Sequence, residues 1–320
     1  MSKICIVLAT YNGEKYLPQM LDSLCAQTRK TDTIIAVDDG SKDSTLEILE
    51  SYKDRLPLQI TAFEKNCGHR AAFSKCLEIA STQTGDEDFI ALADHDDIWL
   101  PQKLALLEKA IEEPVDGKKP DLVFGDANVI DGEGNLVEES WRKIENIQEH
   151  LSLKALLTGF TNVTGCLVLF RASLLKQVLP IPQGVPVHDQ WITLCAAANN
   201  GYKAIKEPVI QYRIHGNNAI GQGSSHTWNH RLNVNLQWST TILATDFYKR
   251  LPEDYQKFLQ EYIRYLKKRL GKNFVFSYLP WLVKNAKALY PHLHHFYQFV
   301  PRILFGIVGV PFATRFMGRK

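Results

Sequence analysis

The stretch KICIVLATYNGEKYLPQMLDSLCAQ, residues 3–27, contains the unit from which the fold is predicted. Lys3–Thr10 is a short, almost continuous apolar run, which is typical of a strand buried on both faces of a sheet. A turn follows, and Tyr16–Gln27 then has the spacing of an amphipathic helix. This alternation of strand and helix recurs up to Asp94. It predicts an α/β protein with a mostly parallel, Rossmann-like sheet and helices on both faces.

Polar residues follow each of the first four predicted strands. The four segments are Thr10–Gly13, Asp38–Ser41, Glu64–Arg70 and Asp94–Asp97. Because ligands of such sheets bind at the carboxyl ends of the strands, we expect these segments to meet at one crevice. Helix capping by Asp43 or Ser44 and a tight turn at Gly40 would explain part of the pattern. Capping accounts less well for four polar strand ends in register.

The fourth segment crowds three carboxylates, Asp94, Asp96 and Asp97, into ALADHDDIWLP, residues 91–101. Repulsion between neighbouring carboxylates raises their pKa values and costs free energy. The cluster is therefore expected where a cation or several hydrogen-bond donors offset this repulsion.

Beyond Pro101 the pattern changes and the sheet is expected to become mixed. The predicted elements are a helix at Lys103–Glu112, a hairpin through GEGN (132–135), a strand at TGCLVLF (164–170), a helix with Asp189 in its first turn, and a strand at EPVIQYRIHGNN (207–218). After Gly221 the chain is expected to be helical, aromatic and basic.

Composition and charge divide the 320 residues into two predicted parts, a domain at 1–222 and a helical extension at 223–320. The extension has 15 Lys and Arg against 4 Asp and Glu, a net charge of +11, whereas residues 1–222 have 22 against 31, a net charge of −9. The extension also holds 19 of the 33 aromatic residues. A basic, aromatic segment favours contact with an anionic membrane face; a soluble helical core and a homodimer interface are the alternatives.

The cysteines and the start of the sequence favour a cytoplasmic location for the protein. The six cysteines are scattered without a Cys-x-x-Cys pair, and the sequence does not start with a secretory pattern.

Seven motifs together resemble the family 2 glycosyltransferases with a GT-A fold, and in particular their bacterial rhamnosyltransferase-like members. The motifs are ATYNGEKYL, VDDGSKDST, the pair Asn66 and Gly68, DHDDIWLPQKL, NVTGCLVLF, HDQW and YRIHGNN, all within residues 3–220. The resemblance implies inverting transfer of a sugar from a nucleoside diphosphate donor to a saccharide or lipid-linked saccharide in cell-surface polysaccharide synthesis. It favours dTDP-rhamnose as the donor, followed by UDP-hexoses. It also implies Mg²⁺ or Mn²⁺ as the cofactor, because carboxylate and phosphate oxygens hold such ions together.

The resemblance also implies a role for individual residues. Asp96 would bind the metal directly, Asp94 would bind the ribose or assist the metal, and His215 would approach the metal or diphosphate. Asp189 would be the base that deprotonates the acceptor hydroxyl. Asp39 would accept a hydrogen bond from the imide N–H of uracil or thymine, which favours a pyrimidine donor, although guanine offers a comparable N–H. The remaining residues expected to bind the nucleotide sugar are Thr10, Tyr11, Asn12, Asp38, Asn66, Arg70, Gly165 and Arg213.

Three other functions would use parts of this pattern. A sugar-nucleotide or polysaccharide-binding protein of the same fold would not need both Asp96 and Asp189. A nucleotidyltransferase would show a glycine- and lysine-rich phosphate loop after the first strand, and TYNGEKY is not such a loop. A nucleic-acid binder would explain the basic extension alone, so nucleic acid is not an expected partner.

Overall fold

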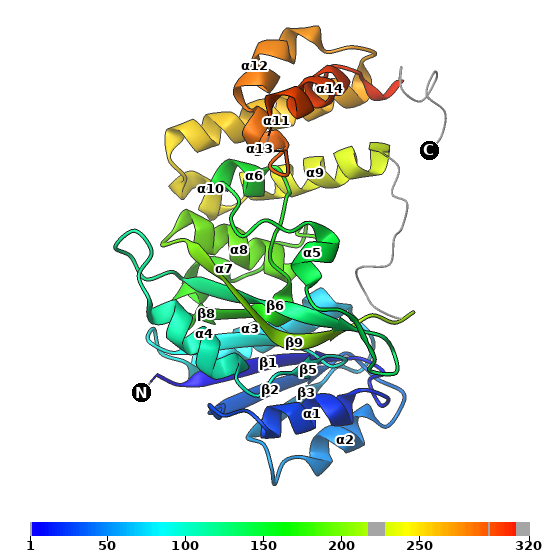
Figure 1. Ribbon diagram of the computed structural model, residues 1–320, viewed down its shortest axis with the longest axis vertical. Coiled ribbons are helices and arrows are strands. Elements are labelled where there is room, and N and C mark those ends of the chain that lie inside the picture. The colour runs from blue at the N-terminus through cyan, green and yellow to red at the C-terminus, as the bar shows by residue number, and fades with distance from the viewer. Residues whose placement is uncertain (1, 217–227, 294, 312–320) are drawn as a thin grey trace. The chain divides into compact units, whose positions relative to one another are not determined.

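The computed structural model describes residues 2–216, 228–293 and 295–311. The chain forms two compact units, whose elements are drawn in Figure 1. The first unit comprises Met1–Glu149, Val163–Ile181 and Val187–Ile220, and the second His150–Asn162, Pro182–Pro186 and Gly221–Lys320. The second unit thus includes two segments from within the range 1–222. Asn217, Asn218 and the terminal residues 312–320 lie outside the described residues.

The first four strands of the first unit pair in parallel, as predicted. They are β1 (Ile4–Thr10), β2 (Thr33–Asp38), β3 (Leu58–Ala62) and β4 (Phe89–Asp94), in the spatial order β3-β2-β1-β4. Every residue of β1 is buried, which explains its unbroken apolar sequence. In the register, Thr10 lies opposite Asp38, and Ala9 lies opposite Asp94. The polar segments after these strands therefore leave the sheet at the same edge.

The sheet becomes mixed beyond residue 101, as the changed pattern predicted. It continues from β4 through β8 (Val168–Arg171), β6 (Leu122–Ile130) and β9 (Tyr202–Arg213) to β5 (Ile98–Trp99). Strand β8 is antiparallel to both β4 and β6, whereas β9 is parallel to β6 and antiparallel to β5. The predicted hairpin is present, since β7 (Leu136–Glu138) pairs antiparallel with β6.

Helices cover both faces of this sheet. Helix α1 (Leu17–Cys25) packs on α2 (Thr45–Ser51), and α3 (His69–Gln83) packs on β1, β2 and α8 (His188–Ala198). Helix α4 (Lys103–Glu112) packs on the mixed part of the sheet. The remaining short helices are α5 (Trp141–Glu145), η1 (Gly165–Leu167), η2 (Ala172–Leu174) and α7 (Leu175–Val178).

The second unit is helical and has its own apolar core. Its elements are α6 (Leu153–Leu157), α9 (Trp228–Leu243), α10 (Asp246–Arg250), α11 (Glu253–Gly271), η3 (Phe276–Tyr278), α12 (Leu279–Lys284), α13 (Ala286–Leu289) and α14 (Phe296–Gly306). Tyr262, Tyr265 and Leu266 of α11 meet Phe299 and Ile303 of α14 in this core. Among the helices in the described parts of the chain, none is long and apolar enough to cross a membrane.

Candidate active site

The end of β1 and the segment after it are hydrogen-bonded to the end of β2 and the segment after it. The Thr10 Oγ1 hydroxyl donates to Asp38 Oδ1 (2.9 Å), and the backbone N–H of Ser41 donates to Asp38 Oδ2 (2.8 Å). Asn12 receives the N–H of Lys42 on its Oδ1 (2.9 Å) and donates its own N–H to Ser41 Oγ (2.8 Å). Asp38 has no exposed surface, and Thr10 only 1%. Both side chains therefore hold the loop in shape, a role that the sequence analysis did not foresee for them.

Asp39 connects this pair of loops to the segment after β3. Its two carboxylate oxygens accept the N–H groups of Cys67 (2.6 Å) and Gly68 (2.8 Å). The side chain is almost fully buried, but each oxygen keeps a further lone pair for a ligand. Tyr11, in the segment after β1, and Asn66, in the segment after β3, are exposed. Arg70 is half-buried in the first turn of α3. The expected contacts of these residues with a base or phosphate stay predictions.

Asp96 and His215 lie together, although 119 positions separate them in the sequence. His215 Nε2 is 3.0 Å from Asp96 Oδ2, and both side chains are mostly buried. The ring of Tyr16 lies 4.9 Å from the His215 ring, centroid to centroid. The segment after β1, the acidic segment after β4 and the end of β9 thus meet at one place.

Arg213 is buried in the structure rather than open to a ligand. Its guanidinium donates to the backbone oxygens of Asp96 (2.9 Å) and Asp131 (3.3 Å) and to Gln19 Oε1 (2.8 Å). Its backbone N–H donates to Asp97 Oδ1 (3.0 Å). Only 1% of Arg213 is exposed. These contacts hold the acidic segment in place, and the expected contact of Arg213 with the nucleotide sugar stays a prediction.

Half-buried Asp94 and fully buried Asp97 form an acidic cluster with Cys166 and Lys103. Ligand atoms of Asp94, Asp97 and Cys166 all lie within 4.8 Å of one another. Burial, reinforced by the charge of Asp96, raises the pKa of Asp94 to about 7 and raises the pKa of Asp97 well above its usual value. Asp97 Oδ2 is buried and has no hydrogen-bond partner among the described residues. The repulsion expected from the sequence is therefore present.

Lys103 places a buried amine beside this cluster, and sequence reasoning missed it. It has no exposed surface, its Nζ donates to the backbone oxygen of Cys166 (2.6 Å), and the same atom lies 3.2 Å from the centroid of the Trp99 ring. Burial lowers the pKa of Lys103 to about 7, against the opposing effect of Asp97 and Asp94. The only signal in the sequence was a lysine opening the helix directly after the acidic run.

The donor atoms fit a hard divalent cation better at Asp96 than at Cys166. Burial raises the pKa of the Cys166 thiol well above its usual value, so this sulfur stays protonated and is a poor ligand for Mg²⁺ or Mn²⁺. Asp96 Oδ2 and His215 Nε2 instead converge at hydrogen-bond distance and are partly accessible. Carboxylate oxygens suit both Mg²⁺ and Mn²⁺.

Asp189 lies in the first turn of α8, as predicted, and its carboxylate is oriented by backbone groups. Its Oδ2 accepts the N–H of Gly165 (2.9 Å), and its Oδ1 accepts the N–H of Gln190 (2.6 Å). A Cβ at position 165 would lie 3.4 Å from Asp189 Oδ2 and 3.3 Å from His188 Nε2, so glycine permits this close approach. Burial raises the pKa of Asp189 to about 6, and the charge of Asp189 in turn raises the pKa of Asp94. The two carboxylates are therefore electrostatic neighbours.

His188 does not orient Asp189 through any hydrogen bond described here. Its ring stacks on Phe73 at 3.9 Å between centroids, and neither ring nitrogen has a hydrogen-bond partner within the described residues. Burial, followed by the charge of His69, lowers its pKa to about 3. The side chain is therefore a neutral ring that packs α8 against α3.

His95 joins the first and fourth strand-end segments. A Cβ added to Gly13 would lie 2.6 Å from Cδ2 of the His95 ring, so this ring lies directly against the Gly13 backbone. The Gly13 N–H donates to Thr45 Oγ1 (2.8 Å). The four polar segments thus form one connected edge of the first unit, as the sequence analysis expected.

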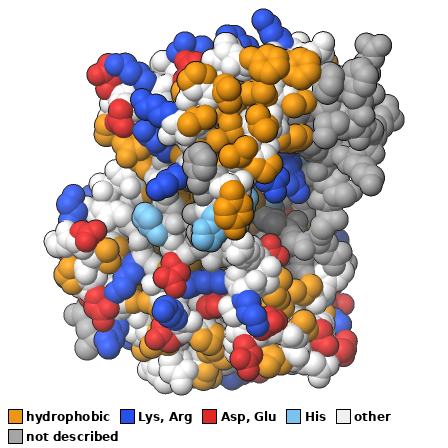
Figure 2. All heavy atoms as spheres, turned by 45° about the horizontal axis from the view of Figure 1, so that its top comes forward, with side chains coloured by type: hydrophobic (Ala, Val, Ile, Leu, Met, Phe, Trp, Pro, Cys, Tyr) orange, Lys and Arg blue, Asp and Glu red, His pale blue; other side chains and the backbone are white. Residues whose placement is uncertain are grey.

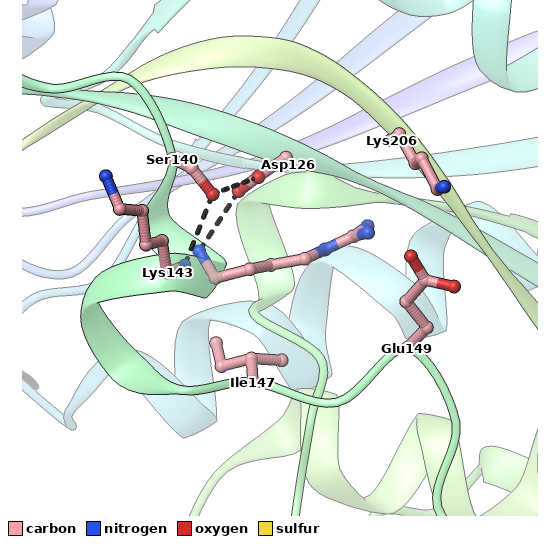
Figure 3. Close-up of a pocket in the computed structure, with 7 residues that line it drawn as sticks. Asp126, Ser140, Lys143, Ile147, Glu149 and Lys206 are labelled. Atoms are coloured by element: carbon pink, nitrogen blue, oxygen red, sulfur yellow. Dashed lines mark hydrogen bonds between the residues drawn. The ribbon is translucent and has the colours of Figure 1, made fainter.

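A separate cavity of about 300 Å³ lies between β6, α5 and β9 (Figure 3). Ser140 Oγ donates to Asp126 Oδ2 (2.5 Å) and accepts the N–H of Lys143 (3.2 Å), which caps α5. Lys206 and Glu149 line the opposite side. None of the predicted site residues, all of which are described, lines this cavity. The contacts of Ser140 in this cavity are those of the cap of α5.

Comparison with solved structures identifies the architecture as that of the GT-A glycosyltransferases. The crystal structure of Staphylococcus aureus TarS 1–349 in complex with UDP-GlcNAc has a TM-score of 0.58 at 21% sequence identity, over 95% of this chain and 84% of that one. The mannosyltransferase PcManGT from Pyrobaculum calidifontis, in complex with GDP-Man and Mn²⁺, has a TM-score of 0.54 at 18% identity, over 95% and 79%. At these sequence identities, the structural similarity shows that this chain shares their fold.

The family follows from the sequence. The model of glycosyl transferase family 2 matches residues 5–179, and the chain belongs to this family of glycosyltransferases. An uncharacterized glycosyltransferase from Nostoc sp. is 29% identical over 236 residues, which are 70% of this chain and 69% of the relative. The poly(ribitol-phosphate) beta-N-acetylglucosaminyltransferase TarS of S. aureus is 37% identical over 99 residues, which are 30% of this chain and 17% of TarS. The family assignment predicted from the seven motifs is confirmed.

Proposed function

We propose that this glycosyltransferase is an inverting, metal-dependent enzyme that moves a sugar from a nucleoside diphosphate to an acceptor hydroxyl. The observation that carries the proposal is the position of Asp189. It is a carboxylate with a pKa of about 6, held by the Gly165 N–H and close enough to the acidic cluster to raise the pKa of Asp94. An inverting displacement needs a base across the sugar from the leaving-group site, and these residues would supply the two.

Asp96 and His215, assisted by Asp94, are the residues that would hold the metal. A divalent ion bound there would neutralise the negative charge that develops on the departing diphosphate. Arg213 and Lys103 keep the acidic segment in place from beneath, through the contacts to Asp96, Asp97 and Cys166 described above. These residues fix the site before a ligand binds, which lowers the cost of ordering it.

Asp189 would take the proton of the acceptor hydroxyl. The acceptor oxygen forms the new bond to the anomeric carbon, while the bond from that carbon to the diphosphate breaks and its electron pair leaves with the diphosphate. Attack from the opposite side inverts the anomeric centre. With a pKa of about 6, Asp189 is mostly deprotonated at neutral pH and yet basic enough to accept the proton. No covalent enzyme intermediate is needed.

We propose a pyrimidine nucleotide donor, dTDP-rhamnose or a UDP-hexose. Asp39 retains lone pairs that can accept an imide N–H, and TarS was crystallised with UDP-GlcNAc, which supports the uridine alternative. The acceptor would be a saccharide or lipid-linked saccharide in cell-surface polysaccharide synthesis, as the poly(ribitol-phosphate) acceptor in the name of TarS suggests. A lipid-linked acceptor would lie at the inner face of the cytoplasmic membrane, where we propose that the basic second unit holds the enzyme.

Calorimetry and a transfer assay test the proposal together. We expect UDP or dTDP to bind more tightly with Mn²⁺ than with chelator, and Asp96→Ala to abolish that difference. Asp189→Asn should keep nucleotide affinity and lose transfer by about a hundredfold to ten-thousandfold. Equal affinity with and without metal would refute the metal site, and near-parental transfer by Asp189→Asn would refute the base.

Two other outcomes would support the alternative functions. Release of diphosphate from a nucleoside triphosphate would indicate a nucleotidyltransferase, and nucleotide binding without turnover would indicate a binding protein.

A further inference from the structure

Helix α14 is apolar on two faces, only one of which the second unit buries. Its inner face places Phe299, Ile303 and Ile307 in or next to the core. Its outer face exposes Tyr297 by 70%, Val300 by 42% and Leu304 by 53%. Steps of three and four residues place these outer side chains in one stripe along the helix. A surface helix of a soluble protein normally has polar residues on such a face.

Neighbouring elements extend this apolar surface. Helix α12 packs on α14 and exposes Leu279 and Val283. The Val275 N–H donates to the backbone oxygen of Ile307 (2.9 Å), which brings the stacked and exposed rings of Phe274 and Phe276 to the end of α14. Figure 2 shows hydrophobic side chains gathered on one face of this unit. We call the exposed side chains of 274, 276, 279, 283, 297, 300 and 304 the α12–α14 face.

The charge near this face is mostly positive, and Glu261 of α11, the nearest acidic residue in the sequence, already pairs with Arg264. Residues 262–311 contain eight Lys and Arg and no Asp or Glu. Lys284 follows Val283 on the outer side of α12, and Lys272 and Arg302 are likewise exposed. Figure 2 shows Lys and Arg side chains beside the hydrophobic cluster. Apolar and aromatic side chains among cations are the combination that binds the headgroup region of anionic bilayers.

We propose that the α12–α14 face docks on an anionic lipid surface, with its apolar side chains in the headgroup–acyl boundary and its lysines and arginines on the phosphates. This assignment rests on the membrane contact proposed above but not on the chemistry of sugar transfer. Helix α14 has 11 residues and is therefore about 16 Å long. It would lie in the plane of the interface, since spanning takes about 20 residues.

A second copy of the chain is a poorer occupant of this face. A two-fold interface places the same patch of both subunits against itself. The exposed cations Lys272, Lys284 and Arg302 would then meet their own copies, and residues 262–311 contain no carboxylate to neutralise them. An anionic bilayer supplies the missing charge.

Vesicle flotation of the full-length protein tests the docking. We expect the parent to float with vesicles of phosphatidylglycerol and phosphatidylcholine at low salt, and about tenfold less with phosphatidylcholine alone or at high salt. The fraction of Val300→Glu/Leu304→Glu that floats with the anionic vesicles should be at least about tenfold smaller than that of the parent. The matched control is Val137→Glu, whose side chain is 59% exposed on β7 of the first unit, and it should float like the parent.

A charge-reversal pair tests the basic residues. Lys284→Glu/Arg302→Glu should weaken flotation, whereas Lys249→Glu/Lys257→Glu should change it little, because those two lysines already pair with Asp246 and Glu253. Far-UV circular dichroism and donor hydrolysis without vesicles should match the parent in all variants. These readouts separate a failed docking surface from a failed transferase assignment.

Three results would overturn the proposal. They are a parent that does not float, a Val300→Glu/Leu304→Glu variant that floats like the parent, and a lipid-free dimer in sedimentation equilibrium that this variant dissociates. The last result would assign the face to a second copy of the chain.

Discussion

The protonation of Asp189 determines where pH should act on the proposed reaction. Burial raises its pKa to about 6, and a base accepts a proton only in its deprotonated form. The active fraction therefore decreases as the pH falls through about 6. We expect kcat at saturating donor to be nearly constant between about pH 7 and 8 and to fall about tenfold per unit well below pH 6.

The Asp189→Asn variant is the control for this pH profile. Its residual rate lacks the carboxylate and should therefore show no acid limb in the same range. Tryptophan fluorescence recorded at each pH separates loss of base from loss of fold. A parental profile without an acid limb, in protein that remains folded, would contradict the assigned role.

Lys103 is the second residue whose replacement should have a large effect. Lys103→Met keeps the length of the side chain but removes the donor to the Cys166 backbone oxygen and the amine that acts electrostatically on Asp94 and Asp97. Breaking one partner of a buried polar cluster typically costs about 3 kcal/mol of the free energy of unfolding. Lys109→Met, at an exposed position of the same helix, should change it by less than about 0.5 kcal/mol. Urea denaturation of both variants measures the difference, and equal midpoints would show that Lys103 is not needed.

The sequence predicted the acidic residues of the site more readily than their supports. Asp94, Asp96, Asp189 and His215 stand in short motifs with evident chemistry, whereas the contact of Lys103 with Cys166 joins residues 63 positions apart. Asp38 and Arg213 appear in the same motifs, but their burial depends on packing that no local pattern reports.

At the scale of elements, the strand-end loops work as one assembly in which Gly13 and His95 touch. Gly13→Ala would place a Cβ 2.6 Å from the His95 ring and push the first and fourth loops apart. We expect this overpacking to cost about 1–3 kcal/mol of stability and to weaken UDP binding.

The double variant Gly13→Ala/His95→Ala tests that contact. Removing the ring makes room for the new methyl group, so the double variant should recover stability and nucleotide affinity relative to Gly13→Ala. Thermal denaturation and calorimetry of the parent, the two single variants and the double variant form a double-mutant cycle. This cycle should give a coupling free energy between positions 13 and 95 of at least about 0.5 kcal/mol. Additive effects would mean that the ring moves aside freely.

The elements themselves were largely predictable, because strands and helices leave local periodic signals. Helix α4 begins and ends at the predicted residues, and Asp189 lies in the first turn of its helix. Strand β9 begins at Tyr202, five residues before the predicted start, because pairing with β6 extends it through a polar stretch. Pairing partners of this kind are non-local and cannot be read from one segment.

At the scale of the whole molecule, the second unit is built from segments on both sides of residue 222. Trp238 of α9 donates its indole N–H to the backbone oxygen of Leu156 (3.0 Å), and Tyr262 of α11 donates to that of Thr158 (3.4 Å). Leu156 and Leu157 are almost completely buried. The composition change near residue 222 predicted a boundary there but carried no sign that residues 150–162 and 182–186 belong to the helical unit.

This composition of the second unit predicts how the chain behaves when it is cut. A protease site introduced within residues 217–227 should yield two fragments that co-elute in size-exclusion chromatography, because 150–162 stays packed with α9 and α11.

The fragment 1–222, when it is expressed alone, should have a lower melting temperature than the full chain and should aggregate. It would lose the partners of Leu156 and Leu157, and burial of a leucine contributes about 1.5–3 kcal/mol. The replacement of both leucines by serine should partly restore its solubility, since the uncovered surface is then polar. Separation of the nicked fragments without denaturant, together with a parental melting temperature for fragment 1–222, would contradict this prediction and leave the first unit as an autonomous catalytic domain.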